Sequence, residues 1–216
     1  MSTERDRSDR PGPVPSPVPG SVDERLERWL GRLLETPGLT AIRDRAEARR
    51  VHLEESLAVA PFVRRYEGPV VDVGSGGGAP GIPLAAAFPD REVVLLEATR
   101  RKCDFLESVT REFPNLRVVC GRAEEQPTGQ FGVAVAKALA PPAVAAEWCL
   151  PLVGVGGAAI LLVGPSVDAA AVARASAQLG GGEPEQYPGV LVLPKTAPTP
   201  AGFPRRAGIA RKRPLA

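Results

Sequence analysis

Short apolar segments alternate with segments of helical periodicity from Pro69 onward, and this alternation limits the possible folds more than any other feature. The apolar segments predict strands near residues 69–73, 92–97, 116–120, 131–136 and 157–163. The periodic segments predict helices near residues 81–88, 99–112, 140–150 and 166–179. Strands that alternate with helices form βαβ units, so we expect an α/β fold in which helices cover both faces of a parallel sheet.

The chain before this region is predicted to have two parts. Alternating prolines prevent helix formation near the N-terminus, and we expect residues 1–20 to be a disordered tail. Residues 21–66 have helical periodicity, with a capping-box spacing at Ser21 and Glu24 and a second helical run at about residues 51–65. The predicted organisation is residues 1–20, residues 21–66, and a core with a basic C-terminal end at residues 67–216.

The composition argues against several classes of protein. Three cysteines without a CxxC pair and a single histidine predict neither a zinc site nor a disulfide scaffold, and a reducing compartment fits this usage. The longest apolar run, residues 149–164, is too short to span a bilayer and is interrupted by one proline and four glycines. The N-terminus is charged where a signal peptide would be apolar. We therefore expect a cytoplasmic protein with neither a membrane nor a metal as partner.

The stretch VVDVGSGGGAPGIPL, residues 70–84, follows the first predicted strand and matches two kinds of cofactor loop. Residues 76–81 match GxGxxG, the fingerprint of dinucleotide-binding loops. Residues 72–78 match the acid-x-GxGxG loop of methyltransferases that use S-adenosylmethionine. Both loops are followed by an acid at the end of the second strand, where Glu97 would accept hydrogen bonds from the ribose hydroxyls of either cofactor. Glu97 therefore does not decide between them.

The position of the strand favours S-adenosylmethionine over NAD. In a dinucleotide loop the first glycine follows the strand directly, but Gly76 comes two residues too late, whereas Gly74 is correctly placed for the methyltransferase loop. Pro80 and Pro83 suit the first turn of a helix but remove amide donors that a pyrophosphate would need. An NAD-linked oxidoreductase and a glycine-rich turn without a ligand are the alternatives.

Six segments of the chain resemble, in order, those of one protein family. They are GLTAIRDRAEARRVHLEESLAVAPF (38–62), VDVGSGGGAPGIPLA (71–85), LLEATRRKCDFLESV (95–109), GRAEE (121–125), FGVAVAKAL (131–139) and FPRRAGIARKRPL (203–215). They resemble the GidB family, also called RsmG, whose members methylate guanine N7 in small-subunit ribosomal RNA. The resemblance is weak at about residues 165–195. It implies a Rossmann-like class I methyltransferase sheet with an N-terminal helical extension.

The resemblance also implies S-adenosylmethionine as the cofactor. Glu97 would bind the ribose, while Ala123 and Glu124 would lie against the adenine, although the pattern GRAEE by itself equally predicts an exposed acidic turn. The predicted cofactor-binding residues are Asp72, Gly74, Gly76, Gly78, Ala79, Glu97, Ala123, Glu124 and Lys137.

The chain departs from the family's pattern at several positions. Lys137 stands where the family has an arginine in a Ser-Arg-Ala triplet, and Gly132 stands where it has an aspartate. Glu55 replaces the aspartate of the motif that begins at His52. The stretch before the C-terminal ending, at about residues 180–200, is short for a β-hairpin. These departures favour, as an alternative, a diverged methyltransferase of the same family with a different substrate.

Methylation of guanine N7 needs no general base, because N7 attacks the sulfonium methyl with a lone pair. The enzyme must align the two reactants and exclude water. Lys137 is the candidate catalytic residue, with the role of positioning the substrate by holding a phosphate or the guanine O6. A non-catalytic relative that binds cofactor or RNA is a further alternative.

Basic residues are concentrated after the second predicted strand and at the C-terminus. Residues 195–216 contain six basic residues and no acid, which is typical of a phosphate-binding segment, with a solvated surface as the alternative. We expect a monomer that binds ribosomal RNA or the small ribosomal subunit. The predicted RNA-binding residues are Arg100, Arg101, Lys102, Arg205, Arg206, Arg211, Lys212 and Arg213.

Overall fold

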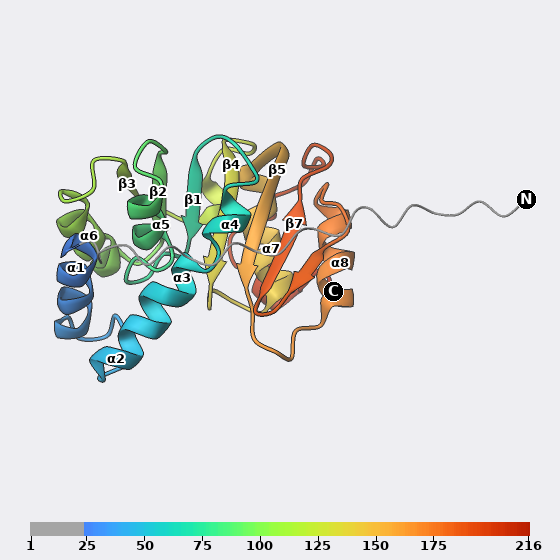
Figure 1. Ribbon diagram of the computed structural model, residues 1–216. Helices are drawn as coiled ribbons and strands as arrows, with labels where there is room; N and C mark the ends of the chain where they lie inside the picture. The colour runs from blue at the N-terminus through green and yellow to red at the C-terminus, as the bar shows by residue number, and fades with distance from the viewer. Residues whose placement is uncertain (1–23) are drawn as a thin grey trace, which may run out of the picture.

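The computed structural model of the chain describes residues 24–216 and shows a seven-stranded sheet between two layers of helices (Figure 1). The strand order is β3-β2-β1-β4-β5-β7-β6. The first five strands are parallel, whereas β7 runs antiparallel to both of its neighbours. The strand order reverses between β1 and β4, which is where ligands of such sheets bind. The strands are β1 (Val70–Val73), β2 (Val93–Glu97), β3 (Leu116–Cys120), β4 (Phe131–Lys137), β5 (Val153–Leu162), β6 (Glu185–Tyr187) and β7 (Val190–Pro194).

The five predicted strands and the four helices predicted between and after them are confirmed. The expectation that the region at about residues 180–200 is too short for a hairpin is wrong, because β6 and β7 pair across a turn at Pro188 and Gly189. Gly189 has a positive φ of 73°, which glycine adopts readily, so two residues are enough to reverse the chain.

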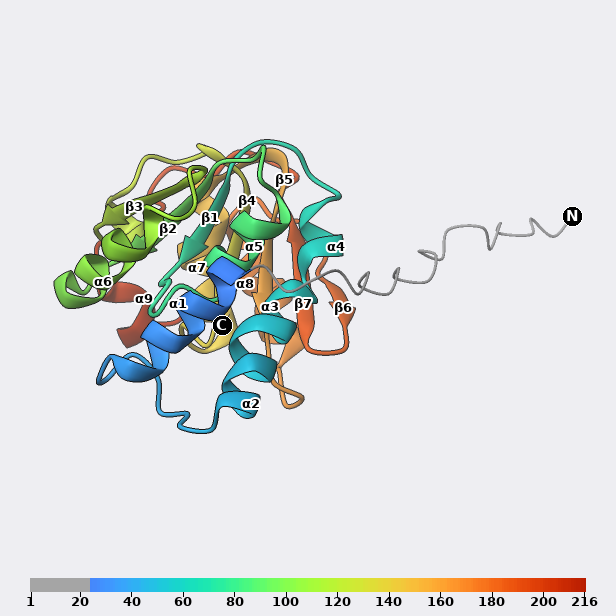
Figure 2. The same ribbon diagram turned by 60° about the vertical axis from the view of Figure 1, so that its left-hand side comes forward.

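Helices cover both faces of the sheet because side chains alternate between the faces along each strand. In β2, Val93 and Leu95 pack against one layer of helices, and Val94 and Leu96 pack against the other. Figure 2 shows α1 and α3 in front of the strands and α7 and α8 behind them. The first layer is α1 (Glu24–Glu35), α2 (Arg45–Ala48), α3 (Glu55–Leu57), α4 (Ala60–Val63), α5 (Gly81–Ala87) and α6 (Arg100–Thr110); the second is α7 (Pro142–Cys149), α8 (Ala169–Gln178) and α9 (Ile209–Lys212).

Helix α1 supports the glycine-rich loop. Its buried Trp29 donates a hydrogen bond from Nε1 to the carbonyl oxygen of Gly77 at 2.8 Å. A Cβ atom on Gly77 would overlap Leu33, so a side chain at this position would push the loop away from α1. The N-terminal helical segment therefore shares its core with the sheet and helps to shape the loop.

The helical run predicted at about residues 51–65 is interrupted. Residues Arg49–Glu54 form a π-helix, η1, between α2 and α3, and π-helical turns are frequent at functional sites. The half-buried His52 lies in this turn, with its Nε2 3.0 Å from Thr40 Oγ1. The predicted cap at Ser21 and the predicted tail at residues 1–20 lie outside the described residues.

Gly132 lies near the start of β4, at the amino ends of the parallel strands, whereas the glycine-rich loop lies at their carboxyl ends. Its N–H donates to the carbonyl oxygen of Pro69 at 2.9 Å, and a Cβ atom would overlap the carbonyl oxygen of Glu67. The departure from the family's aspartate at Gly132 is therefore explained by close backbone packing, away from the predicted cofactor residues.

We expect Gly132→Ala to destabilise the protein by about 1–3 kcal/mol, because the backbone atoms that face the new methyl group cannot rotate away. Urea unfolding followed by circular dichroism would measure the change. Gly164→Ala is the matched control, since a Cβ atom there has no neighbour within 4 Å among the described residues. Equal unfolding midpoints for the two variants would contradict this account of Gly132.

Candidate active site

The glycine-rich loop begins directly after β1 and turns back under the carboxyl ends of the strands. Gly74, Gly76 and Gly78 have positive φ angles of 72°, 58° and 105°. The Gly74 N–H donates to the carbonyl oxygen of Leu96 at 2.7 Å, which holds the loop against β2. A Cβ atom on Gly74 would also overlap Leu139, which follows β4. Glycine at position 74 is therefore favoured by its backbone conformation, and a side chain there would also displace the tip of Leu139.

Asp72 is buried beneath this loop and anchors the helix that follows it. One carboxylate oxygen accepts a hydrogen bond from the Gly81 N–H at 3.0 Å, at the start of α5. Burial raises the pKa of Asp72 to about 7, and the negative charge of Glu97 adds to this rise. The hydrogen bond from Gly81 and the positive charge of Lys137 act in the opposite direction. Asp72 thus links the end of β1 to the start of α5 beneath the loop.

Glu97 connects the loops that follow β1 and β2. Its Oε2 accepts a hydrogen bond from the Gly76 N–H at 3.0 Å, and its Oε1 accepts one from the Thr99 N–H at 2.8 Å. Each carboxylate oxygen has two lone pairs, so both can still accept a hydrogen bond from a ligand hydroxyl.

A cavity of about 370 Å³ opens at the carboxyl ends of β1, β2 and β3, within the usual size range of small-molecule sites. Four of the predicted cofactor-binding residues line it, namely Gly74, Glu97, Ala123 and Glu124. Residues that the sequence did not point to also line it, namely Thr99, Leu139, Trp148 and Gly208. The other predicted cofactor residues, Asp72, Gly76, Gly78, Ala79 and Lys137, are outside this lining.

Lys137 ends β4, one residue before the cavity wall begins at Ala138. Its ammonium lies 3.1 Å from a carboxylate oxygen of Glu55 and donates a hydrogen bond to the carbonyl oxygen of Val51. The side chain is 14% exposed. Lys137 therefore joins the fourth strand to the π-helical turn of the N-terminal segment, and its charge is paired with Glu55.

The three basic residues at the start of α6 have different surroundings. Arg100 forms an ion pair with Asp104 on the same helix at 2.8 Å. Arg101 donates a hydrogen bond to the carbonyl oxygen of Pro37 at 3.1 Å, in the turn after α1. Lys102 lines the cavity.

The basic C-terminal residues also divide into groups. Arg205 binds the carboxylate of the buried Glu147 through two of its nitrogens, so its charge is used inside the fold. Arg211 is exposed and lines the cavity as well. The other predicted RNA-binding residues of this segment, Arg206, Lys212 and Arg213, are exposed.

Comparison of the sequence with known proteins shows the family to which it belongs. The family model GidB, described as rRNA small subunit methyltransferase G, matches residues 24–192. The chain belongs to this family. The GidB relative from Synechococcus elongatus, a ribosomal RNA small subunit methyltransferase G, is 35% identical over 222 residues, covering 93% of this chain and 92% of that protein. The protein of the same description from Chloroflexus aggregans is 37% identical over 212 residues, covering 88% and 89%.

Solved structures support the fold of this GidB protein. A CurJ carbon methyltransferase has a TM-score of 0.58 and 10% identity, covering 79% of this chain and 68% of that chain. A SAM-dependent O-methyltransferase from Thermotoga maritima has a TM-score of 0.55 and 12% identity, covering 68% and 66%. At these identities the likeness concerns the fold alone. The predictions of a Rossmann-like methyltransferase fold, of GidB family membership and of an S-adenosylmethionine-dependent methyltransferase are confirmed.

The residues around the cavity fit S-adenosylmethionine. Glu97 offers acceptor positions for a ribose, and Gly74 has no side chain that would stand between its backbone and a ligand. Trp148 contributes a buried Nε1–H that has no hydrogen-bond partner within the described part of the chain. Between residues 24 and 216, no cluster of potential metal ligands was found, and no helix is long and apolar enough to cross a membrane.

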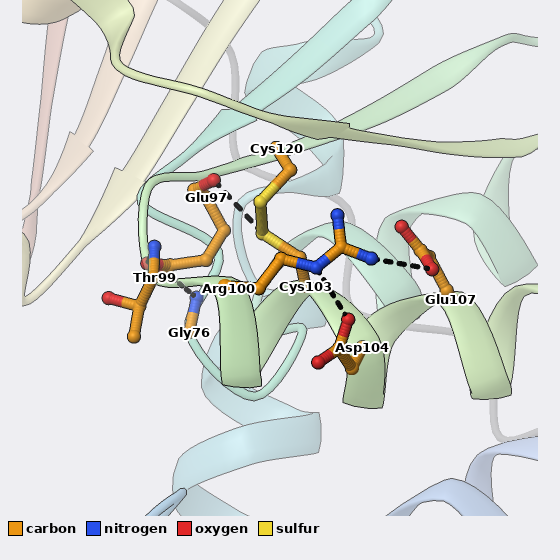
Figure 3. Close-up of a disulfide and its surroundings, with 8 residues drawn as sticks. All are labelled: Gly76, Glu97, Thr99, Arg100, Cys103, Asp104, Glu107 and Cys120. Atoms are coloured by element: carbon orange, nitrogen blue, oxygen red, sulfur yellow. Dashed lines mark hydrogen bonds and ion pairs between the residues drawn. A yellow bond between two sulfur atoms is a disulfide. The ribbon is translucent and has the colours of Figure 1, made fainter.

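A disulfide joins two segments that carry cavity residues. Cys103 on α6 and Cys120 at the end of β3 are bonded, with their Cα atoms 5.8 Å apart (Figure 3). Cys103 Sγ lies 3.2 Å from the carbonyl oxygen of Glu97, and Cys120 directly precedes Gly121 of the cavity wall. No disulfide was expected from the sequence, and this pair corrects that expectation. The two cysteines are 17 residues apart and meet only because α6 packs against β3.

We expect Asp72→Asn to flatten the dependence of stability on pH. The folded-state pKa of Asp72 is about 7, above the value near 3.9 of an unfolded chain, so the folded state binds the extra proton between these values. The stability that this proton contributes is lost as pH rises from about 4 to about 7, and asparagine removes that loss. Urea unfolding at several pH values would measure it. The exposed Asp90→Asn should keep the wild-type profile, and an unchanged profile for Asp72→Asn would disprove the assignment.

We expect reduction of the Cys103–Cys120 bond to lower the free energy of unfolding by about 3 kcal/mol, the chain-entropy value for a loop of about this length. Urea unfolding with and without a phosphine reductant would show the difference, and alkylation with mass spectrometry would report the bond. Cys120→Ser should unfold identically in both conditions. A wild-type midpoint that does not respond to reductant would refute the expectation.

Proposed function

We propose that this protein transfers the methyl group of S-adenosylmethionine to N7 of a guanine in small-subunit (16S) ribosomal RNA. The observation that carries the proposal is the cavity lined by Gly74 and Glu97 at the carboxyl ends of β1 and β2, in a chain that belongs to the GidB family. We also propose that it acts in the cytoplasm, as a monomer, on ribosomal RNA or the small subunit.

The proposed cofactor contacts follow the path of the cavity. Glu97 accepts hydrogen bonds from the ribose hydroxyls, and Ala123 and Glu124 lie against the adenine. Gly74 lets the backbone approach the cofactor closely. The remaining predicted residues of the loop act on its shape: Asp72 holds α5 in place, and Gly76, Gly78 and Ala79 form the turn between β1 and α5.

Methylation of guanine N7 requires the protein to align the two reactants and does not require it to transfer a proton. S-adenosylmethionine, when bound, supplies a methyl group on a positively charged sulfur. Guanine N7 has a free lone pair, so the side chains need to hold the base in line with the methyl group and to exclude water. This requirement agrees with a cavity that has Glu97 and Glu124 as its acidic groups, with no histidine in its lining.

Lys137 is proposed to position the RNA substrate. It stands at the carboxyl end of β4, next to the cavity wall, and carries a positive charge that could hold a phosphate or the guanine O6. Its ion pair with Glu55 means that RNA must compete with this carboxylate or share the lysine with it. The exposed basic residues would contact the RNA backbone; they are Arg206, Lys212 and Arg213.

The Lys137–Glu55 pair also favours a second candidate function, a methyltransferase of the same family with a different acceptor. A lysine ammonium lacks the planar fork with which arginine binds phosphates or stacks on bases. Where Glu55 neutralises that charge, the attraction for an RNA phosphate is reduced.

We expect the purified protein to add one N7-methylguanosine to 16S ribosomal RNA in small subunits taken from a strain that lacks its gene. Mass spectrometry of digested RNA would measure the modification. Glu97→Gln should weaken cofactor affinity by about tenfold or more, because an amide nitrogen would then face a backbone N–H where a carboxylate oxygen accepted it.

The matched control is Glu92→Gln, an exposed glutamate that pairs with Arg117. This variant should bind the cofactor and methylate RNA as the wild type does. Cofactor binding without methylation of 16S RNA would favour the second candidate. Failure of the wild-type protein to bind S-adenosylmethionine in calorimetry would reject both.

A further inference from the structure

The basic C-terminal residues are part of the folded body. The segment 203–215, here called the C-terminal strap, packs Phe203 and Leu215 against the core shared by α7 and α8 and buries Ala210. The side-chain amide of Gln178 on α8 donates a hydrogen bond to the carbonyl oxygen of Leu215 at 3.2 Å. The strap therefore has a fixed path across the second helical layer.

Two polar contacts fix the strap next to the cavity. Arg205 forms a two-pronged ion pair with Glu147, whose side chain is 2% exposed. Three residues further on, the Gly208 N–H donates to Oε1 of Glu124 at 3.2 Å. Glu124 is a cavity residue in the turn after β3, so the strap is joined directly to the part of the wall proposed to lie against the adenine.

Arg211 of the strap lines the cavity next to Glu124 and Gly208. Its guanidinium lies over the ring of Trp148, 5.3 Å from the ring centroid, and donates to the carbonyl oxygen of Leu139 at 3.4 Å. All three residues line the same cavity. No acid is paired with Arg211 in the described part of the chain, unlike Arg205. Its planar group is thus held in place by an aromatic ring and a carbonyl.

Trp148, which lies beneath Arg211, also lines the cavity and carries a donor that is unpaired in the described part of the chain. Its side chain is nearly fully buried, and its Nε1–H has no hydrogen-bond partner among residues 24–216. A buried donor without a partner costs about 1–3 kcal/mol, and a ring nitrogen or hydroxyl of a ligand would satisfy it.

We propose that Arg211, supported by Trp148, is a cofactor-binding residue that contacts the adenosyl part of S-adenosylmethionine. The inference rests on the proposed function. Adenine is a planar aromatic ring with nitrogen acceptors at its edge, and a guanidinium can both stack on such a ring and donate to its nitrogens. The strap then forms part of the wall of the cofactor site, and Arg211 contributes to cofactor affinity in the absence of any RNA.

Isothermal titration calorimetry without RNA tests the proposal. We expect Arg211→Ala to raise the dissociation constant for S-adenosylmethionine about tenfold, and to raise those for S-adenosylhomocysteine and adenosine by a similar factor, since all three carry the adenosyl group. Arg211→Lys keeps the charge but lacks the planar group, so we expect it to restore only part of the affinity. Both variants should fold as the wild type does, with the same circular dichroism spectrum, because Arg211 is exposed on the strap.

Arg206→Ala is the matched control, an exposed arginine of the same strap outside the cavity lining, and it should leave all three dissociation constants unchanged. Wild-type affinity of Arg211→Ala for all three ligands would overturn the proposal while leaving the proposed function intact. The same holds if the variant loses affinity for S-adenosylmethionine but keeps it for adenosine. If the wild-type protein binds none of these ligands, the proposed function and this inference are both rejected.

Discussion

The central strands are buried on both faces, so the sheet can present polar groups to a ligand only at the ends of its strands. All residues of β1 and β2 are buried. At the end of β2 the Glu97 carboxylate accepts backbone hydrogen bonds from Gly76 and Thr99, one in each of the two loops that leave these strands. These two bonds fix the loops relative to each other, and the cavity between them depends on that arrangement.

Segments from both ends of the chain complete the site. Trp29 of α1 donates a hydrogen bond to the loop at Gly77. Lys137 at the end of β4 binds the π-helical turn at Val51 and forms an ion pair with Glu55 at the start of α3. The strap closes another side through Gly208. The loop that follows β1 is therefore held in position by α1, whereas the strap closes the side of the cavity that follows β3. A ligand bound in the cavity would stabilise all of these contacts together.

The sequence predicted the parts of the fold that local patterns determine. Strands buried on both faces are continuous apolar runs, and Gly74 was assigned from its distance to the end of β1. Glu97 was predicted in a similar way, because both kinds of cofactor loop are followed by an acid at the end of the second strand. The hairpin of β6 and β7 was not predicted because the segment is short, yet Pro188 and Gly189 are enough to reverse the chain there.

Contacts between distant segments could not be predicted in this way. Periodicity indicates that Trp148 is buried, but not that its ring faces a cavity and carries Arg211. The spacing of Cys103 and Cys120 has no recognised motif, and their bond depends on how α6 packs against β3. Such pairs are set by the register of one element on another, which a single sequence does not record.

The basic residues illustrate why charge alone is a weak guide to function. Arg205 and Arg206 are neighbours in the strap with the same side chain, yet Arg205 binds a buried carboxylate and Arg206 is exposed. Removing Arg205 would leave Glu147 buried and unpaired, a loss typically worth about 3–5 kcal/mol, so its charge is committed to folding. Arg211 is exposed like Arg206, but its guanidinium lies over the Trp148 ring at the cavity. The role of each cation therefore follows from the group it contacts and not from the net charge of the segment. Arg205 anchors the strap, Arg211 forms part of the cavity wall, and Arg206 remains on the surface proposed to contact RNA.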